Sequence, residues 1–401
     1  HRLRELERQM KHVLIVNNNM HIGGVQKALV NLLHEIHGDY EVTLLLFYAG
    51  GELCVEIPED VQVITARSPF RYWGMTRHDA VGLKDRLART FWAAATRLLG
   101  RGAVLRLAYP LQKKLGDYDA AVSYLHSGPL RTFYGGCNEF VLRCVRAKRK
   151  VTFLHCDFEK IHAASPYNMR IYQQFDGIAA CSSGCRDSFL RAFPQLADKT
   201  TVTRNCQNYP QVRRLAQNAP VTLPTGRLNI VTVARFGKEK GILRAIQAVA
   251  ALGEKANALH YYLIGDGAEY ALAEEQIAAL GLTETITLLG ELAVPYGYMQ
   301  AADVLLIPSF SEAAPMVIGE AACLGTPILT TETSSAREMV EQPGLGWVCE
   351  NTVEGIRTGL EELLSRPEAL QEKRAHMQAL AFDNTCARKQ FAELIEQDAD
   401  R

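Results

Sequence analysis

The sequence predicts an α/β fold of two domains, each containing a parallel sheet covered by helices. Short apolar runs alternate with helical patterns; HVLIV at 12–16, for example, precedes GVQKALVNLLHEIH at 24–37. This alternation is typical of parallel strands joined by helices. It starts again after residue 226, and 401 residues exceed what one ordinary core needs. Two such halves imply a cleft, with ligands at the carboxyl ends of the strands.

The expected elements form two series. Residues 207–226 lie between the series, are polar and proline-bearing, and are predicted to be an interdomain linker. We therefore expect one domain over 10–206 and a second over 207–382, followed by a final helix in 383–401. The first series of strands is expected at 12–16, 40–48, 61–65, 118–124, 150–155, 177–182 and 199–206, and the second at 227–236, 258–267, 286–291 and 302–309.

The composition indicates a globular protein that does not bind nucleic acid through net charge. Lys plus Arg and Asp plus Glu are both 44, and 48% of the residues are apolar. No apolar run is long enough to span a bilayer, and the ten cysteines form no CxxC pair, which fits a reducing compartment. We expect a cytoplasmic protein. HRLRELERQ at 1–9 is expected to be a tag remnant or an upstream extension, because Met10 runs straight into the first strand.

Residues 67–114 interrupt the α/β pattern with a basic segment. They contain eleven Lys or Arg against two acids, Asp79 and Asp85, with large apolar residues between the charges. The pattern predicts one or two basic amphipathic helices. Two interpretations stay open: a solvated helical face over the domain core, or a patch that rests on an anionic membrane surface.

Two cations follow the first strand of the second series. In VARFGKEKG, Arg235 follows the strand and Lys240 precedes Gly241, which opens a helix. Such a pair at a strand-to-helix turn suits a diphosphate, whose charge Arg and Lys neutralise. A pair of solvated surface cations is the alternative.

A second strand-to-helix turn carries two carboxylates. In PSFSEAAPMVIGEA, Glu312 lies in the loop and Glu320 on the second turn of the helix, and Pro315 fits the first helical turn. The first N–H groups of the helix, at Met316 and Val317, form an anion site. A nucleoside diphosphate laid across this start would meet these amides, and its hydroxyls would meet the carboxylates.

These motifs together resemble the retaining glycosyltransferases of family 4, with the GT-B fold of two Rossmann-like domains. The resemblance rests on E-x7-E from Glu312 to Glu320, on RF-x3-KG from Arg235, and on IGDG, LLGE and GGVQKAL, in order and spacing. It runs from Met10 to about residue 396. One departure is that Ala313, Ala314 and Pro315 stand where many relatives have glycines, which leaves the donor sugar open.

The resemblance implies roles for individual residues. Arg235 and Lys240 would bind the donor diphosphate, Glu320 the ribose, and Glu312 hydroxyls of the transferred sugar. His155 would lie near the reacting centre, with a core histidine as the alternative. The final helix would return to the N-terminal domain. The residues implied in donor binding are Glu320, Met316, Val317, Ala314, Gly23, Gly24 and Leu289, and those implied in catalysis are Arg235, Lys240, Glu312 and His155.

The resemblance further implies a retaining transfer of a hexose in surface polysaccharide or glycolipid synthesis. A UDP-sugar is favoured over a GDP-sugar, the acceptor would be a saccharide or a lipid-linked saccharide, and neither a metal nor a cofactor is expected. The D-x-D match at 117–119 is expected in a turn before a strand. A nucleotide-sugar epimerase and a catalytically silent nucleotide-sugar-binding scaffold are the competing functions. The basic segment would place the protein peripherally on the inner face of the plasma membrane.

Overall fold

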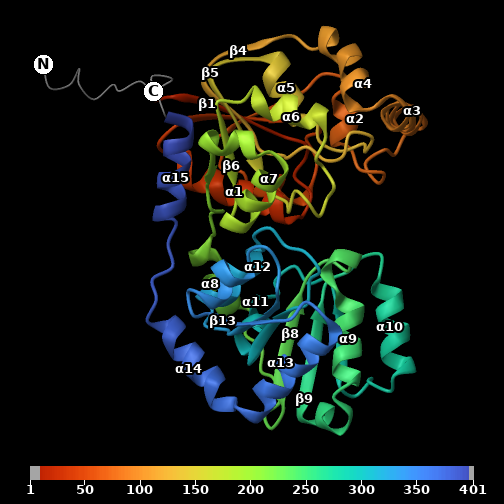
Figure 1. The fold of residues 1–401 in the computed structure, drawn as a ribbon, viewed down its shortest axis with the longest axis vertical. Helices are drawn as coiled ribbons and strands as arrows, with labels where there is room; N and C mark the ends of the chain where they lie inside the picture. The colour runs from red at the N-terminus through yellow and green to blue at the C-terminus, as the bar shows by residue number, and fades with distance from the viewer. Residues whose placement is uncertain (1–9, 397–401) are drawn as a thin grey trace, which may run out of the picture. The chain divides into compact units, whose positions relative to one another are not determined.

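The computed structural model describes residues 10–396, so the expectation for residues 1–9 lies outside the described residues. The chain divides into two compact units. Unit 1 comprises the residues up to Cys206 together with those from Asn384 onward, and unit 2 comprises Gln207–Asp383. Figure 1 shows that each unit is a sheet with helices packed around it.

Unit 1 contains a seven-stranded parallel sheet in the order β3-β2-β1-β4-β5-β6-β7. Leu29 and Leu33 of α1 and Phe391 of α15 pack with strand residues in one core. The C-terminal α15 thus belongs to unit 1, where it lies against β5 and β6 (Figure 1). The strands are β1 His12–Asn17, β2 Glu41–Leu46, β3 Gln62–Thr65, β4 Leu115–Ser123, β5 Val145–Leu154, β6 Gly177–Ala180 and β7 Thr200–Val202; the α-helices are α1 Gly24–Ile36, α2 Arg71–Gly74, α3 Leu83–Leu99, α4 Arg101–Ala108, α5 Cys137–Cys144, α6 Pro166–Gln173, α7 Ser183–Ala192 and α15 Thr385–Glu396.

Unit 2 contains a six-stranded parallel sheet in the order β10-β9-β8-β11-β12-β13. The strands are β8 Leu228–Val233, β9 Leu259–Ile264, β10 Ile286–Gly290, β11 Val304–Ile307, β12 Ile328–Thr331 and β13 Gly346–Cys349; the α-helices are α8 Tyr209–Asn218, α9 Ile242–Ala250, α10 Tyr270–Ala279, α11 Tyr296–Ala301, α12 Met316–Cys323, α13 Val353–Ser365 and α14 Pro367–Gln378. The two parallel sheets confirm the predicted α/β fold class.

The predicted linker 207–226 is only in part a linker, because α8 occupies half of it. The Asn208 side chain caps this helix by accepting a hydrogen bond from the Gln211 N–H. Pro210 stands in the first turn, where a proline costs no helical hydrogen bond. Val212 and Ala216, four residues apart, are buried within unit 2. Pro210 and the polar residues, which predicted a loop, lie instead at the start of α8 and on its outer face.

The basic segment 67–114 forms α3 and α4, as predicted, but one of its cations is not at the surface. Arg101, the first residue of α4, is fully buried, and its Nε lies 2.7 Å from a carboxylate oxygen of Glu139. No helix in the described part of the chain has a stretch both long enough and apolar enough to cross a membrane.

Candidate functional site

The loops that follow β8 and β11 are locked together at the carboxyl edge of the unit 2 sheet. Gly241 has a φ of 68°, and a Cβ there would lie 2.1 Å from the carbonyl oxygen of Pro308. The Phe310 N–H donates to the carbonyl of Glu239 at 2.9 Å. Glycine is therefore required at 241, because any side chain would push the two loops apart. These contacts bring the RF-x3-KG motif against the loop that carries Glu312.

Lys240 and Glu312 form an ion pair at the centre of this loop pair. The Lys240 ammonium lies 2.7 Å from Oε1 of Glu312, and the two side chains are only 25% and 11% exposed. The Ser309 hydroxyl donates to the same oxygen at 2.7 Å. The Ser334 hydroxyl donates to the Glu312 carbonyl at 2.9 Å. The pair is thus fixed in position, and it presents one cation and one carboxylate at the end of β11.

Arg235 lies at the end of β8, as expected, but it faces solvent and does not contact Lys240 or Glu312. Its side chain is 75% exposed, and its guanidinium pairs with Glu239 four residues on, at 2.7 Å. Exposed pairs of this kind contribute little to stability. The pair can therefore open at low cost, which leaves the guanidinium available to an anion.

Helix α12 begins at Met316, one residue later than predicted. Pro315 is the residue before the helix, with extended backbone (ψ 126°), and Met316 is the first helical residue. The first N–H groups of the helix, at Met316 and Val317, have no acceptor within the helix, as at any helix start. Ala314 is half-buried in the approach to this turn.

Glu320 is on the second turn of α12, and it is buried instead of exposed at the surface. Only 4% of the residue is exposed, and the Tyr296 hydroxyl lies 3.5 Å from its carboxylate. Burial strengthens any hydrogen bond that this carboxylate accepts.

Arg244 is a residue of this region that the sequence analysis missed. It is 95% buried at the start of α9, and its Nε donates to the Pro308 carbonyl at 2.8 Å. Its guanidinium lies 3.7 Å from the centroid of the Phe310 ring. Burial lowers its pKa. Arg244 therefore positions the loop after β11, and no local pattern in the sequence indicates its burial.

The IGDG motif makes β9 end earlier than predicted, at Ile264. Gly265 and Gly267 have φ of 140° and 151°, and a Cβ on Gly265 would lie 1.8 Å from the Ala234 carbonyl oxygen. This turn lets the Phe236 N–H donate to the Asp266 carbonyl at 2.8 Å. Leu289 in β10 is half-buried and packs against an apolar cluster of unit 2. The IGDG motif thus packs against the RF-x3-KG loop and holds it in place.

In unit 1, the loop between β1 and α1 carries Gly23 and Gly24. Gly23 is the residue before α1 and has extended backbone, and no other atom lies within 4 Å of a Cβ built on Gly24. Packing within the chain therefore does not explain the absence of a side chain at Gly24. His21 in the same loop lies 2.9 Å from the carboxylate of Asp79 and 3.3 Å from that of Glu52.

His155 follows β5, and it is not a hydrogen-bonded core histidine. Its ring stacks on Phe153 at a centroid distance of 5.6 Å and lies 4.6 Å from the Tyr124 ring. Within the described residues, its buried Nε2 has no hydrogen-bond partner. Burial lowers its pKa to about 3, with a smaller contribution from His126. A neutral ring with an unpaired nitrogen can accept a hydrogen bond from, or donate one to, a bound hydroxyl.

His126, which follows β4, is a second histidine of the same kind that the sequence analysis missed. Burial, then the Arg101 charge, lowers its pKa to about 4, and its Nε2 lies 3.4 Å from the Tyr134 hydroxyl. Its Nδ1 has no partner in the described part of the chain. His126 follows β4 and His155 follows β5, the next strand along the chain. This position after a strand was the feature of the sequence that could have indicated His126.

These two histidines should make unit 1 sensitive to acid. In the unfolded chain each takes up a proton near its ordinary pKa of 6.5, whereas the folded rings stay neutral. Because both pKa values are lowered, their stabilising effect is present above pH 6.5 and is lost as the pH falls toward 4. Between pH 7.5 and 5 we expect a loss of about 2 kcal/mol per histidine.

The measurement is urea unfolding in a Trp347→Phe background, so that Trp73 and Trp92 report on unit 1. His155→Gln should remove about half of the pH-dependent loss. A loss of the same size in the His155→Gln chain would contradict the neutral state assigned to His155.

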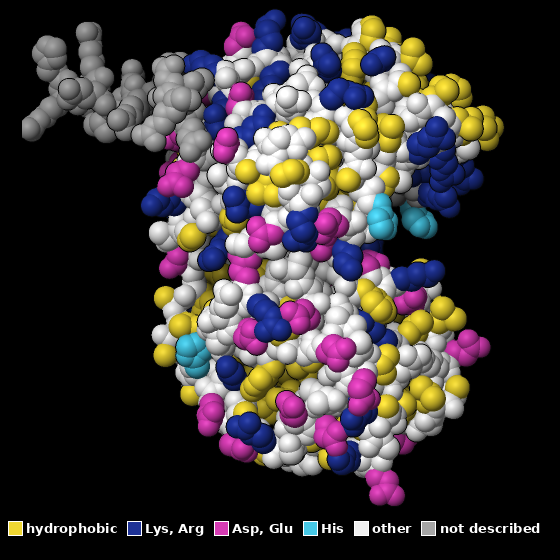
Figure 2. Space-filling model, in the orientation of Figure 1, with side chains coloured by type: hydrophobic (Ala, Val, Ile, Leu, Met, Phe, Trp, Pro, Cys, Tyr) yellow, Lys and Arg dark blue, Asp and Glu magenta, His cyan; other side chains and the backbone are white. Residues whose placement is uncertain are grey.

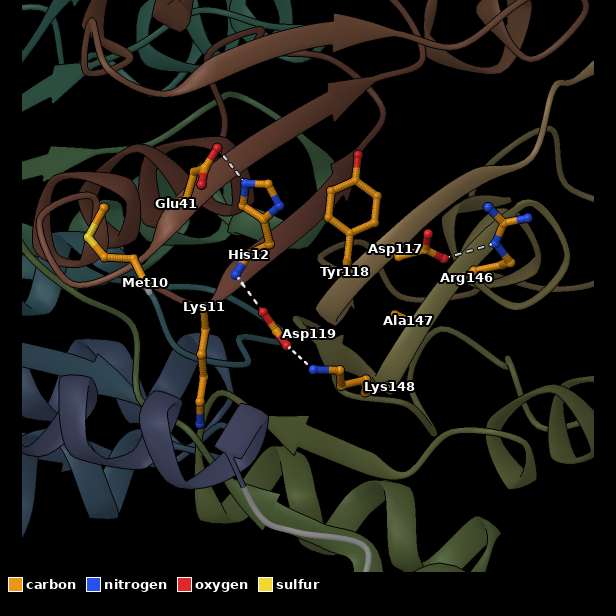
Figure 3. A pocket seen from close by; sticks show the side chains of 10 residues that line it. All are labelled: Met10, Lys11, His12, Glu41, Asp117, Tyr118, Asp119, Arg146, Ala147 and Lys148. Carbon is orange, nitrogen blue, oxygen red and sulfur yellow. Dashed lines mark hydrogen bonds and ion pairs between the residues drawn. The ribbon is translucent and has the colours of Figure 1, made fainter. Parts of the chain in front are cut away.

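A hollow of about 760 Å³ lies at the amino edge of the unit 1 sheet, and Figure 3 shows the residues that line it. Asp117 and Asp119 lie inside β4 and not in a turn before it, so the D-x-D expectation is wrong in this respect. Their carboxylates pair with Arg146 at 3.1 Å and Lys148 at 2.6 Å. The alternating register of a strand directs both side chains to one face, where the neighbouring β5 supplies the cations. These carboxylates are engaged in structural ion pairs.

Residues 214–381 match the family model described as Glycosyl transferases group 1. The matched region contains Arg235, Lys240, Glu312 and Glu320.

The curated relatives match over part of their length. The amylovoran biosynthesis glycosyltransferase AmsK of Erwinia amylovora is 28% identical over 185 residues, which are 42% of this chain and 44% of AmsK. The putative colanic acid biosynthesis glycosyltransferase WcaL of Escherichia coli K12 is 31% identical over 139 residues, 32% of this chain and 34% of WcaL. The matches thus span less than half the length of these relatives.

Solved structures match over nearly the whole chain. Anabaena Alr3699/HepE in complex with UDP and glucose superposes with a TM-score of 0.67 at 20% identity, covering 96% of this chain and 98% of that one. WaaG, a glycosyltransferase involved in lipopolysaccharide biosynthesis, gives 0.62 at 16% identity and covers 96% and 100%. At these identities the likeness shows the fold, and it confirms two Rossmann-like domains of the GT-B kind.

Proposed function

We propose that this protein is a retaining glycosyltransferase that moves a hexose from a UDP-sugar to a saccharide or lipid-linked saccharide in surface polysaccharide or glycolipid synthesis. The observation that carries the proposal is the fixed Lys240–Glu312 pair beside the start of α12, within the region that matches the Glycosyl transferases group 1 model. The names of AmsK and WcaL, and the UDP bound to Alr3699/HepE, support a UDP-sugar and a polysaccharide product.

Unit 2 supplies the groups that would hold the donor. Lys240, together with Arg235 once it leaves Glu239, would neutralise the diphosphate, and the N–H groups of Met316 and Val317 would donate to its oxygens. Glu320 would accept hydrogen bonds from the ribose. Glu312, held by Lys240 and Ser309, would accept from hydroxyls of the transferred sugar.

The chemistry we propose keeps the configuration at the anomeric carbon. The acceptor oxygen attacks from the face that the nucleotide leaves, and the departing phosphate takes the acceptor proton. The protein contributes orientation and charge stabilisation, without a metal. Glu312 is a poor candidate for a nucleophile, because Oε1 already accepts hydrogen bonds from Lys240 and Ser309. A covalent sugar on Glu312, found by mass spectrometry, would contradict this.

Glu320→Gln should weaken UDP-sugar binding about 10- to 100-fold, because the amide keeps the shape of the side chain and loses its charge-assisted hydrogen bonds. The measurement is the rise in melting temperature on adding UDP, GDP, ADP and their sugar conjugates, since a ligand of the folded state raises it. Glu275→Gln, an exposed acid on α10, is the matched control.

We expect the parent chain and Glu275→Gln to respond to uridine nucleotides and Glu320→Gln to respond weakly. An unchanged response in Glu320→Gln would remove Glu320 from the donor site. A parent chain that responds to none of the nucleotides would contradict the proposed glycosyltransferase function.

We further propose that the protein works in the cytoplasm, peripherally on the inner face of the plasma membrane, through exposed residues of 67–114. Arg101 takes no part in this, because it is buried.

A further inference from the structure

Four arginines of unit 1 surround one hollow of about 560 Å³ that has no part in the proposed donor site. Arg86, Arg89 and Arg97 lie three, eight and eleven residues apart along α3, a spacing that places them on one helical face. Arg77 approaches from the loop before the helix. The remaining wall is formed by Ala80, Thr90, Ala93, Ala94 and Phe133.

In the described part of the chain, no ion pair neutralises the positive charge of this hollow. Among the described residues, no carboxylate lies within ion-pair distance of Arg77, Arg86, Arg89 or Arg97, whereas Arg71 nearby does pair with Asp85. Burial lowers the pKa of Arg89, and the neighbouring charges of Arg77 and Arg97 lower it further. The charge of Asp79 acts in the other direction and raises the pKa of Arg89. The Asp79 carboxylate is itself held by contacts with Thr76 and His21.

Backbone contacts hold two of the guanidinium groups in place. The Arg86 Nε donates to the Ala80 carbonyl at 3.0 Å, and the Arg89 Nε donates to the Met75 carbonyl at 2.8 Å. The Arg89 guanidinium also lies 5.5 Å from the centre of the Phe133 ring. Each group is anchored through Nε, which leaves its terminal N–H groups for an anion. Guanidinium forks match the oxygens of phosphate groups.

The adjoining face of α3 is apolar and exposed. Leu83, Leu87, Phe91 and Leu98 repeat at helical spacing, and they are 73%, 63%, 63% and 73% exposed. More than half of the exposed large apolar side chains of the described residues lie between Val81 and Leu111. Figure 2 shows dark-blue side chains gathered beside yellow ones over α3. A patch this apolar beside arginines is typical of a surface that enters a lipid interface.

We propose that the hollow lined by Arg77, Arg86, Arg89 and Arg97 binds the phosphate or diphosphate group of a membrane lipid, while Leu83, Leu87, Phe91 and Leu98 enter the bilayer beside it. The occupant is a lipid and not a nucleic acid, because three of the four exposed apolar side chains next to the arginines are leucines, and Phe91 alone does not form a row of stacking aromatics. The inference rests on the proposed function: it makes the acceptor a saccharide carried on a lipid phosphate or diphosphate.

The test is co-sedimentation of the full chain with phosphatidylcholine vesicles that carry a polyprenyl diphosphate, compared with vesicles of equal charge that carry phosphatidylglycerol. Binding should be stronger to the diphosphate vesicles and should be displaced by inorganic pyrophosphate. Arg86→Gln/Arg97→Gln should weaken it about 30-fold, at about fivefold per arginine. Lys84→Gln/Arg106→Gln, an exposed pair outside the hollow, is the charge-matched control and should weaken it much less.

A second variant separates the two parts of the surface. Phe91→Ser/Leu98→Ser should lose vesicle binding and keep pyrophosphate binding, read by Trp92 fluorescence. Equal losses in the two charge variants, equal binding to both vesicle types, or stronger binding to an RNA oligonucleotide would each overturn the proposal. Melting-temperature shifts with UDP-sugars are measured on the same samples: shifts without vesicle binding would overturn only this inference, and absence of both would overturn the proposed function as well.

Discussion

Lys240→Ala should lower kcat about 100- to 1,000-fold while donor affinity falls much less. The reason is that charge grows on the departing diphosphate in the transition state, so that a fixed cation stabilises that state more than the bound donor. Lys240 is suited to this, because Glu312 and the loop locked by Gly241 hold its ammonium in one place. The measurement is kcat and KM with a UDP-sugar, together with the dissociation constant of UDP.

Lys238→Ala is the matched control, since Lys238 is an exposed cation two residues away. It should leave kcat within about twofold, as expected for a surface substitution. Weakened donor affinity with an unchanged kcat in Lys240→Ala would mean that Lys240 binds the ground state as tightly as the transition state. Loss of folding in Lys240→Ala is checked by its melting temperature, because Glu312 is left without its cation.

The fold could be predicted because its signals are local. A buried parallel strand is typically a short run of β-branched and aliphatic residues, and the eleven ranges predicted as strands all lie within five residues of the observed strand ends. The predicted ends of helices and strands were wrong where a residue type is compatible with two local structures. Pro210 marks the start of α8 and was read as a loop residue, and Gly265 ends β9 because its φ of 140° suits glycine.

The candidate site was predictable where the topology of the sheet brings residues together. Lys240 and Glu312 each follow a strand of one parallel sheet, and the carboxyl ends of neighbouring strands meet at one edge. Arg244 and His126 were missed because their importance comes from burial, which no local pattern shows. A buried arginine looks like any helix-surface arginine in the sequence, and only its partners reveal it.

Arg101 is the clearest case of this limit, since it stands in a basic segment and is fully buried. Its guanidinium contacts Glu139 at 2.7 Å and Asn168 at 2.8 Å, and it also donates to the carbonyl of Gly128 at 3.3 Å. Further carbonyls, of Pro129 and Tyr134, lie at 3.4 Å. One side chain thus ties α4 to α5, to α6 and to the loop that holds His126.

Arg101→Met should therefore lower the free energy of unfolding of unit 1 by about 3–5 kcal/mol, because the buried Glu139 carboxylate loses its partner. Urea unfolding followed by Trp73 and Trp92 in the Trp347→Phe chain measures this. Arg106→Met, an exposed arginine of α4, should change it by less than about 0.5 kcal/mol. Arg101→Met/Glu139→Gln should recover part of the loss, since the unpaired charge is gone. Recovery stays partial because the carbonyls of the 128–134 loop still lack their donor. A double variant no more stable than Arg101→Met would show that these carbonyls, and not the ion pair, account for the loss.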